Sequence, residues 1–233
     1  MNPSVDKQKK EFEAYLKRLD KKELYELIYT FAKDHSDIEN YILANILIGK
    51  KDIDGAFSVA RDLNSDIWNN VASDTKVFVP DFTLLTNVVK ELLDAGYADQ
   101  ILDLGNEIID NCRVELETEY EDIVIDEDAT ITAITPLLEV IKDAVLDSSL
   151  SDDERLLWLF DATLLYGTED ICQPFVDYIS DDTSKDDWDP VVDILLERME
   201  EEDFEEKYAP NILEWCKHAF SCAGRIDEFP YDL

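Results

Sequence analysis

The sequence predicts an all-α protein made of irregular antiparallel helical hairpins, about ten to eleven helices in all. Apolar residues recur at helical spacing over most of the chain, and strand-type alternation is confined to residues 75–79 and 123–125. Apolar pairs also run into a glycine and a short polar turn at four places. These places are residues 46–49, 92–96, 164–167 and 222–224. Glycine commonly ends helices because it adopts a left-handed backbone without strain, so the four places are predicted helix ends.

The clearest hairpin is centred on Gly96. Apolar residues from Leu84 to Leu93 precede this glycine, and a second apolar series runs from Ile101 to Ile109. We expect two antiparallel helices, the second extending to about Glu117.

The residues before this hairpin contain further helix signals. A first helix is expected over about residues 5–19, and Asp20 begins a second one in a capping box with Glu23. We expect the second helix to bury one stripe, Leu24, Leu27, Ile28 and Phe31. Ser36 begins a third helix that stops at Gly49.

A fourth helix should bury the apolar residues between Ala56 and Leu63, and Pro80 should open the next helix near its first position.

The C-terminal half gives comparable signals. A helix is expected over residues 129–146, where Pro136 either kinks it or starts its regular part. Ser151 and Glu154 form a second capping box. A shorter helix is expected over residues 171–179, followed by a polar loop over residues 180–187.

Asp189 and Pro190 should then open a helix as its N-cap and first residue, and the last helix is expected over residues 204–222.

The acidic stretch 117–128 is the best predicted boundary. It would separate N-terminal hairpins (residues 1–116) from C-terminal hairpins (residues 129–225), with an acidic, aromatic tail at residues 226–233. One continuous domain is the alternative.

The charge of the chain is unusual. Its 233 residues hold 56 acids and 21 bases, a net charge of −35 with a pI near 4.1. Residues 1–22 hold seven bases and four acids, a net of +3, which leaves −38 for the remainder. Such a body repels nucleic acids and anionic membranes, so direct binding to either is not expected. Three explanations of this negative charge are open: it keeps the protein soluble, it adapts the protein to high salt, or it binds a basic partner.

The sequence favours a cytoplasmic location. No apolar run approaches the length of a membrane span, and no apolar signal region follows Met1. Four scattered cysteines are expected to be reduced: Cys112, Cys172, Cys216 and Cys222.

Enzyme chemistry is not expected, and we predict no catalytic residue, cofactor or metal. The phosphate-binding glycine loop, the Gly-x-Ser-x-Gly motif and the His-Glu-x-x-His motif are absent, and the chain has two histidines. Cys216, His218 and Cys222 form one close group, but positions i and i+2 of a helix diverge too far to share an ion easily. A hydrolase that uses clustered carboxylates and a metal is the one enzymatic alternative to the binding functions given below.

The repeat type is irregular. Partial tetratricopeptide-like and HEAT-like patterns occur around Gly96, but the spacing between the punctuating glycines is not constant. Three segments resemble the helical region that follows the zinc module of prokaryotic SWIM zinc finger proteins. They are Leu19-Asp20-Lys21-Lys22-Glu23-Leu24 with Ser36, the stretch Ser151–Trp158, and the stretch Asp187–Val192. The likeness covers about residues 12–200. The family's Cys-x-Cys and Cys-x-His are absent, so the resemblance implies a helical interaction region without the zinc module.

These observations predict a non-enzymatic protein-interaction module whose acidic surface selects a basic protein partner. A nucleic-acid mimic that inhibits a DNA- or RNA-binding protein is the alternative. The sequence singles out one candidate contact region, where a tryptophan lies among acids and is the least obviously buried of its kind. Its residues are Trp188, Asp181, Asp182, Asp186 and Asp187.

Overall fold

The computed structural model describes residues 14–69, 77–118, 120, 123–164, 171–181, 183–199 and 212–230, without the side chains at positions 34, 69, 164, 181 and 212. Within these residues it has ten α-helices from α2 to α12, helical backbone at residues 14–16, one short two-stranded sheet and a 3-10 turn, so the all-α prediction is confirmed. The helices are α2 (Lys21–Asp34), α3 (Ser36–Lys50), α4 (Ile53–Asn69), α5 (Thr83–Asp94), α6 (Ala98–Glu117), α7 (Glu127–Asp147), α8 (Asp152–Leu164), α9 (Gln173–Asp181), α10 (Lys185–Met199) and α12 (Ile212–Cys222). The strands are β1 (Val77–Phe78) and β2 (Val124–Ile125), and η2 is Ile226–Glu228.

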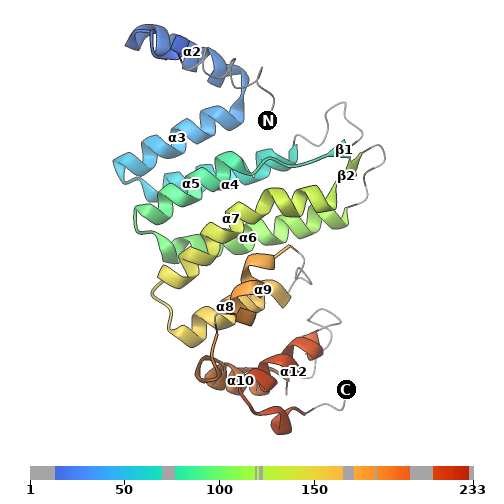
Figure 1. The fold of residues 1–233 in the computed structure, drawn as a ribbon. Helices are drawn as coiled ribbons and strands as arrows, with labels where there is room; N and C mark the ends of the chain where they lie inside the picture. Colours follow the sequence, from blue (N-terminus) through green and yellow to red (C-terminus); the bar gives the residue numbers. More distant parts are fainter. Residues whose placement is uncertain are drawn as a thin grey trace.

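The helices form an elongated column that follows the order of the chain (Figure 1). α2 lies at one end and α10 and α12 lie at the other, while α4 to α7 fill the middle. The buried apolar residues between Ala44 and Ala223 make one cluster, and α6 packs directly on α7 across the acidic stretch 117–128. None of the described helices combines the length and apolar content that crossing a membrane requires.

Two glycines end helices as predicted. Gly96 has a φ of 88°, its N–H donates to the Leu93 carbonyl at 2.8 Å, and the Tyr97 N–H donates to the Leu92 carbonyl at 3.1 Å. This pair of bonds is the Schellman motif. Gly224, with a φ of 68°, ends α12 in the same way.

The predicted end of α3 at Gly49 is wrong. The helix runs to Lys50, and Lys51 takes the left-handed backbone with a φ of 60°. The Lys51 and Asp52 N–H groups donate to the Ile48 and Leu47 carbonyls, so the same motif forms two residues later with lysine in the glycine position. Gly167 lies outside the described residues.

Both predicted capping boxes lie at helix starts. The Asp20 carboxylate accepts the Glu23 N–H, and the Glu23 carboxylate accepts the Asp20 N–H. At α8, the Glu154 carboxylate accepts the Ser151 N–H at 2.8 Å and the Ser151 hydroxyl at 2.7 Å. These bonds to Ser151 lower the pKa of Glu154.

The roles predicted for Pro80 and Pro190 are wrong. α5 begins at Thr83, three residues after Pro80, and Pro190 lies inside α10. α10 begins earlier because the Asp187 carboxylate accepts the Ser184 N–H and hydroxyl, both at 2.7 Å, which fixes the helix start there.

The polar loop predicted over residues 180–187 is correspondingly shorter, because α9 extends to Asp181 and α10 begins at Lys185. Pro136 lies inside α7, which is assigned as one helix from Glu127 to Asp147.

The buried stripe predicted for α2 is wrong in part. Leu24 and Leu27 are half-buried, but Ile28 and Phe31 are exposed. The reason is position: α2 lies at the end of the column and packs chiefly on α3.

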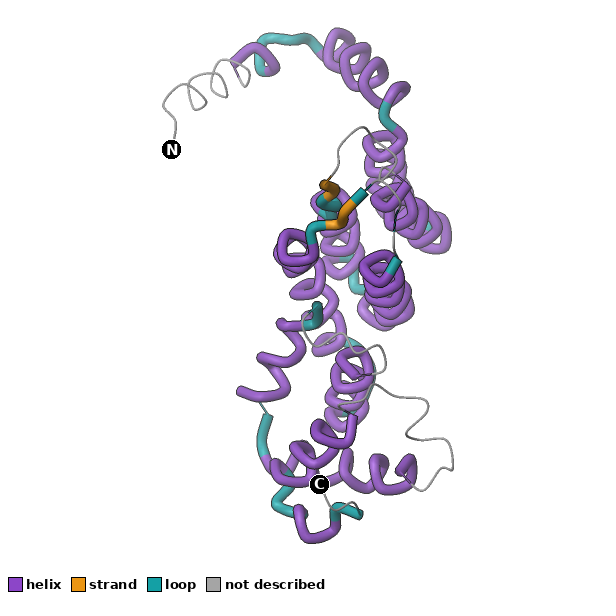
Figure 2. The backbone as a smooth tube through the Cα atoms, turned by 90° about the vertical axis from the view of Figure 1, so that its right-hand side faces the viewer, coloured by secondary structure: helices purple, strands orange, loops and turns teal. Residues whose placement is uncertain are grey.

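The two short predicted strand segments pair with each other. β1 and β2 are parallel, with Val77 opposite Val124 and Phe78 opposite Ile125. The Asp126 N–H adds a bond to the Phe78 carbonyl at 3.0 Å. This pairing ties the connector before α5 to the start of α7 at one side of the column (Figures 1 and 2).

Candidate functional site

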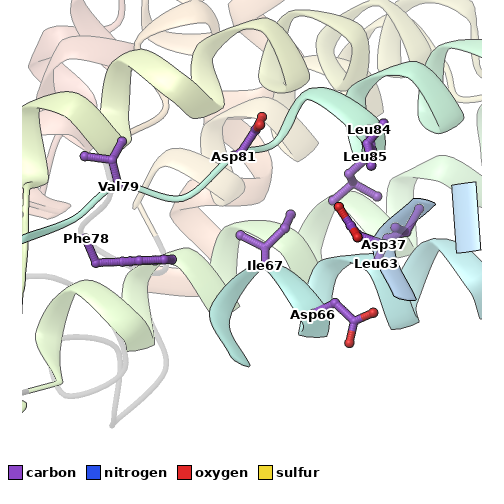
Figure 3. A pocket seen from close by; sticks show the side chains of 9 residues that line it. All are labelled: Asp37, Leu63, Asp66, Ile67, Phe78, Val79, Asp81, Leu84 and Leu85. Carbon is purple, nitrogen blue, oxygen red and sulfur yellow. The ribbon is translucent and has the colours of Figure 1, made fainter. Parts of the chain in front are cut away.

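A hollow of about 160 Å³ lies where α3, α4, β1 and the start of α5 meet (Figure 3). Three aspartates line it: Asp37, Asp66 and Asp81. Six apolar residues complete the lining: Leu63, Ile67, Phe78, Val79, Leu84 and Leu85. We call these nine residues the acidic hollow.

The β1 wall of the acidic hollow is held by aromatic packing as well as by strand pairing. The Trp68 ring lies 6.3 Å from the Phe78 ring and 5.8 Å from the Phe82 ring, the latter edge to face. Trp68 and Phe82 are both buried. The connector is therefore fixed against the C-terminal end of α4, and the hollow is part of the folded structure.

The three aspartates come from three elements. Asp37 lies in the first turn of α3, Asp66 accepts a hydrogen bond from the Asn40 side-chain amide at 3.1 Å, and Asp81 accepts the Thr83 N–H at 2.9 Å. In Figure 3, Asp66 and Asp81 lie at separate edges of the hollow. Among the described residues, the lining includes no lysine, arginine or histidine. Carboxylates beside an apolar floor suit a group that carries a positive charge next to an apolar one.

A second hollow, of about 490 Å³, lies at the other end of α4 against α6. Arg61 lines this hollow and supplies a positive charge to it. The Arg61 Nε donates to both Glu107 carboxylate oxygens, at 2.9 and 2.8 Å. This hydrogen bonding raises the pKa of Arg61. Internal pairing of this kind makes the second hollow less suited to an added cation.

Most of the arginines are used inside the chain. Arg61, Arg113, Arg155, Arg198 and Arg225, five of the six in the sequence, form ion pairs with acids of the described residues. At the C-terminal end, Arg225 joins Asp193 of α10 at 2.7 Å to Glu228 of η2 at 2.6 Å. Because these arginines are already paired with acids, they do not neutralise the remaining acids of the chain.

Trp188, the predicted anchor, is buried, so the expectation that it is accessible is wrong. Only 1% of its surface is exposed, its indole N–H donates to the Thr183 hydroxyl at 2.9 Å, and its ring meets Phe160 edge to face at 5.8 Å. The sequence places it among aspartates, but helical periodicity turns it inward toward α8.

The aspartates around Trp188 lie in α9, in α10 and between them, at the far end of the column from α3 (Figure 1). Asp186 is exposed, and Asp187 caps α10, where its bonds to Ser184 lower its pKa. The Asp181 side chain and Asp182 lie outside the described residues. Their role in partner binding stays a prediction, and the structure does not bring them to the acidic hollow.

The cysteine and histidine group of α12 is split. Cys216 is buried, and burial raises the pKa of its thiol to about 12. The Cys222 sulfur lies 3.4 Å from Nε2 of the exposed His218. Within the described residues no set of three or more histidine, cysteine, aspartate or glutamate side chains is arranged to hold a metal ion.

No family model, no curated protein and no solved structure matches this chain.

Proposed function

We propose that this protein is a non-enzymatic interaction module, acting in the cytoplasm, that binds a basic segment of a protein partner at the acidic hollow. The observation that carries the proposal is the lining itself, in which three aspartates lie beside six apolar residues. A lysine or arginine beside a large apolar residue is the matching chemistry, because the charge meets the carboxylates while the apolar group covers the floor.

The size of the hollow favours a side chain over a small-molecule substrate. At about 160 Å³ it is smaller than the roughly 300–1,000 Å³ of typical ligand pockets. It would hold one anchoring side chain of a longer segment, and neighbouring acids would meet the flanking bases. This is how extended helical proteins commonly bind partners, and it agrees with the interaction role that the SWIM-associated resemblance implies.

The negative surface charge speeds association with a basic partner and disfavours acidic ones. A net charge of −35 attracts basic proteins over a distance of about 10 Å at ordinary salt and repels acidic ones. Association should therefore be fast at low salt, and it should weaken as salt is added.

The test is a titration with a fluorescein-labelled peptide that alternates pairs of lysine and leucine. We expect its affinity to fall about tenfold or more between 50 and 500 mM salt. A peptide with serine for leucine and one with glutamate for lysine should both bind more weakly, because each lacks one half of the match.

A pair of charge-matched variants locates the contact. Asp37→Asn with Asp66→Asn should weaken the lysine–leucine peptide about three- to tenfold. Asp143→Asn with Asp147→Asn removes the same charge from exposed positions of α7 and should leave affinity almost unchanged. Equal losses in the two variants would contradict a defined site. Displacement from a basic DNA-binding protein by duplex DNA would favour the nucleic-acid mimic instead.

A further inference from the structure

Several large apolar side chains of α2 are exposed, and no described helix covers them. Four side chains leave much of their surface in solvent: Tyr25 (67%), Ile28 (44%), Tyr29 (61%) and Phe31 (53%). We call them the α2 surface. None of the described side chains of α2 is buried, and Figure 2 shows this end of the column curving away from the rest.

The α2 surface is ordered by helical spacing. Tyr25, Ile28 and Tyr29 occupy positions i, i+3 and i+4, which place them on one side of the helix. The Tyr25 and Tyr29 rings are stacked, with centroids 6.2 Å apart and planes 13° apart. α3 also leaves two apolar side chains exposed, Leu43 and Ile46, at helical positions turned away from the buried Ala44.

A column of stacked helices normally ends on a polar outer face, because an apolar one would draw other molecules to it. The far end of this column follows that rule more closely: Arg225 joins Asp193 to Glu228, and the Phe229 ring packs on Phe220 at 5.3 Å. The α2 end has no comparable cover among the described residues.

Charge limits what can cover the α2 surface. α2 holds three lysines and three acids, so its charges balance, whereas the whole chain carries −35. Two copies repel each other strongly at any contact between their bodies. A contact at α2 brings together nearly neutral surfaces and leaves the acidic bodies at opposite ends of the assembly.

We propose that the α2 surface binds the same surface of a second copy of this chain, giving a two-fold symmetric dimer joined end to end. Partly exposed aromatic and aliphatic side chains of this number bury roughly 500 Å² per copy, or about 1,000 Å² in all. That is the lower end of specific interfaces, so the dimer dissociates in the micromolar range.

Salt separates this proposal from the proposed function. Added salt screens the repulsion between the two acidic bodies and therefore strengthens the dimer. The same salt weakens binding of a basic partner at the acidic hollow. Failure of one proposal leaves the other standing, because the two contacts use different residues and respond oppositely.

The test is sedimentation equilibrium of the full chain from about 1 to 200 µM, with a reductant present so that Cys222 cannot cross-link. We expect the average mass to rise from 26.8 kDa toward twice that value, and to rise at lower protein concentration in 500 mM salt than in 50 mM. A mass that stays at 26.8 kDa under every condition overturns the proposal.

Variants locate the interface. Tyr25→Gln with Tyr29→Gln should weaken dimerisation at least tenfold while keeping α2 helical, since glutamine is a good helix former. Far-UV circular dichroism checks the helix. Val114→Ser with Val124→Ser changes exposed valines of α6 and β2 and should leave dimerisation unchanged.

Two further results would contradict the proposal. Loss of dimerisation in the valine variant but not the tyrosine variant places the interface elsewhere. Dimerisation that occurs only after deletion of residues 1–13 shows that the chain's own N-terminal residues occupy the α2 surface.

Discussion

α2 and α6 are both amphipathic helices, but α2 is exposed to solvent and α6 is surrounded by other helices. α6 buries eight residues between Ala98 and Cys112, because α4, α5 and α7 pack around it. α2 buries none of its described side chains and packs chiefly on α3. The difference teaches that helical periodicity predicts which residues share a side, whereas position in the column decides whether that side is covered.

The same contrast separates two kinds of surface. In the middle of the column the apolar residues are used for packing, and the acidic hollow is edged by aspartates. At the α2 end the apolar residues remain in solvent while the charges balance. We therefore propose that the first region binds basic partners and that the second associates with its own copy.

The largest expected effect comes from comparing a buried large side chain of α10 with an exposed one of α2. Trp188→Ala should lower the free energy of unfolding by about 3–5 kcal/mol, since it empties a buried site and leaves Thr183 without its indole partner. Phe31→Ala should lower it by less than about 1 kcal/mol, because more than half of that ring is already exposed. Urea unfolding of both variants at low micromolar concentration measures the difference. Equal losses would mean that α2 is covered in solution.

Glycines within helices should respond with opposite signs. A Cβ on Gly105 of α6 would lie 2.9 Å from the Ile141 Cγ2 atom and 3.4 Å from Trp158, so Gly105→Ala should destabilise by about 1–3 kcal/mol. Gly49 of α3 has open space around it, so Gly49→Ala should stabilise by about 0.5–1 kcal/mol. Thermal and urea unfolding give both values. Stabilisation by Gly105→Ala would contradict the close approach of α6 to α7.

Helix caps give the smallest difference and add a pH dependence. Asp187→Asn should cost about 0.5–1 kcal/mol at pH 7, because it weakens the bonds from Ser184 that start α10. Those bonds lower the pKa of Asp187 below its ordinary 3.8, so their contribution is present above that pH. It is lost as the pH falls through the folded-state pKa, and urea unfolding at pH 3 and below should show the variant and the parent converging.

The matched change at the other end is Asp20→Ala, which removes the side chain that caps α2. Because α2 buries no described side chain, it can unfold without the body. We expect faster hydrogen exchange in α2 and almost no change in global unfolding. A global loss as large as that of Asp187→Asn would show that α2 unfolds together with the body.

Much of the fold could be predicted from the sequence because its signals are local. Gly96 and the box of Asp20 with Glu23 act within a few residues, and the structure places both as expected. The errors occurred where two local signals competed. Pro190 suggested a helix start, but Ser184 with Asp187 gives a stronger one upstream, and Lys51 took the backbone position expected of Gly49.

The candidate site could not be predicted in the same way. Asp37, Asp66 and Asp81 are three of 56 acids, and only the packing of α3, α4 and the β1 connector brings them together. The pairing of β1 with β2 joins residues 47 positions apart in the chain, from Val77 to Val124, and no local pattern encodes it. Trp188 failed as an accessible anchor for the same reason, because burial depends on a distant helix.

The most direct test of the central claim is an ¹H–¹⁵N NMR titration of the full chain with the lysine–leucine peptide at 100 mM salt. We expect the largest shift changes on the amides of residues 37, 66, 78, 79 and 81–85. These changes should saturate at 100 mM salt and be lost at 500 mM salt. Shift changes that concentrate on residues 183–199, or that spread evenly over every acidic helix, would contradict binding at the acidic hollow.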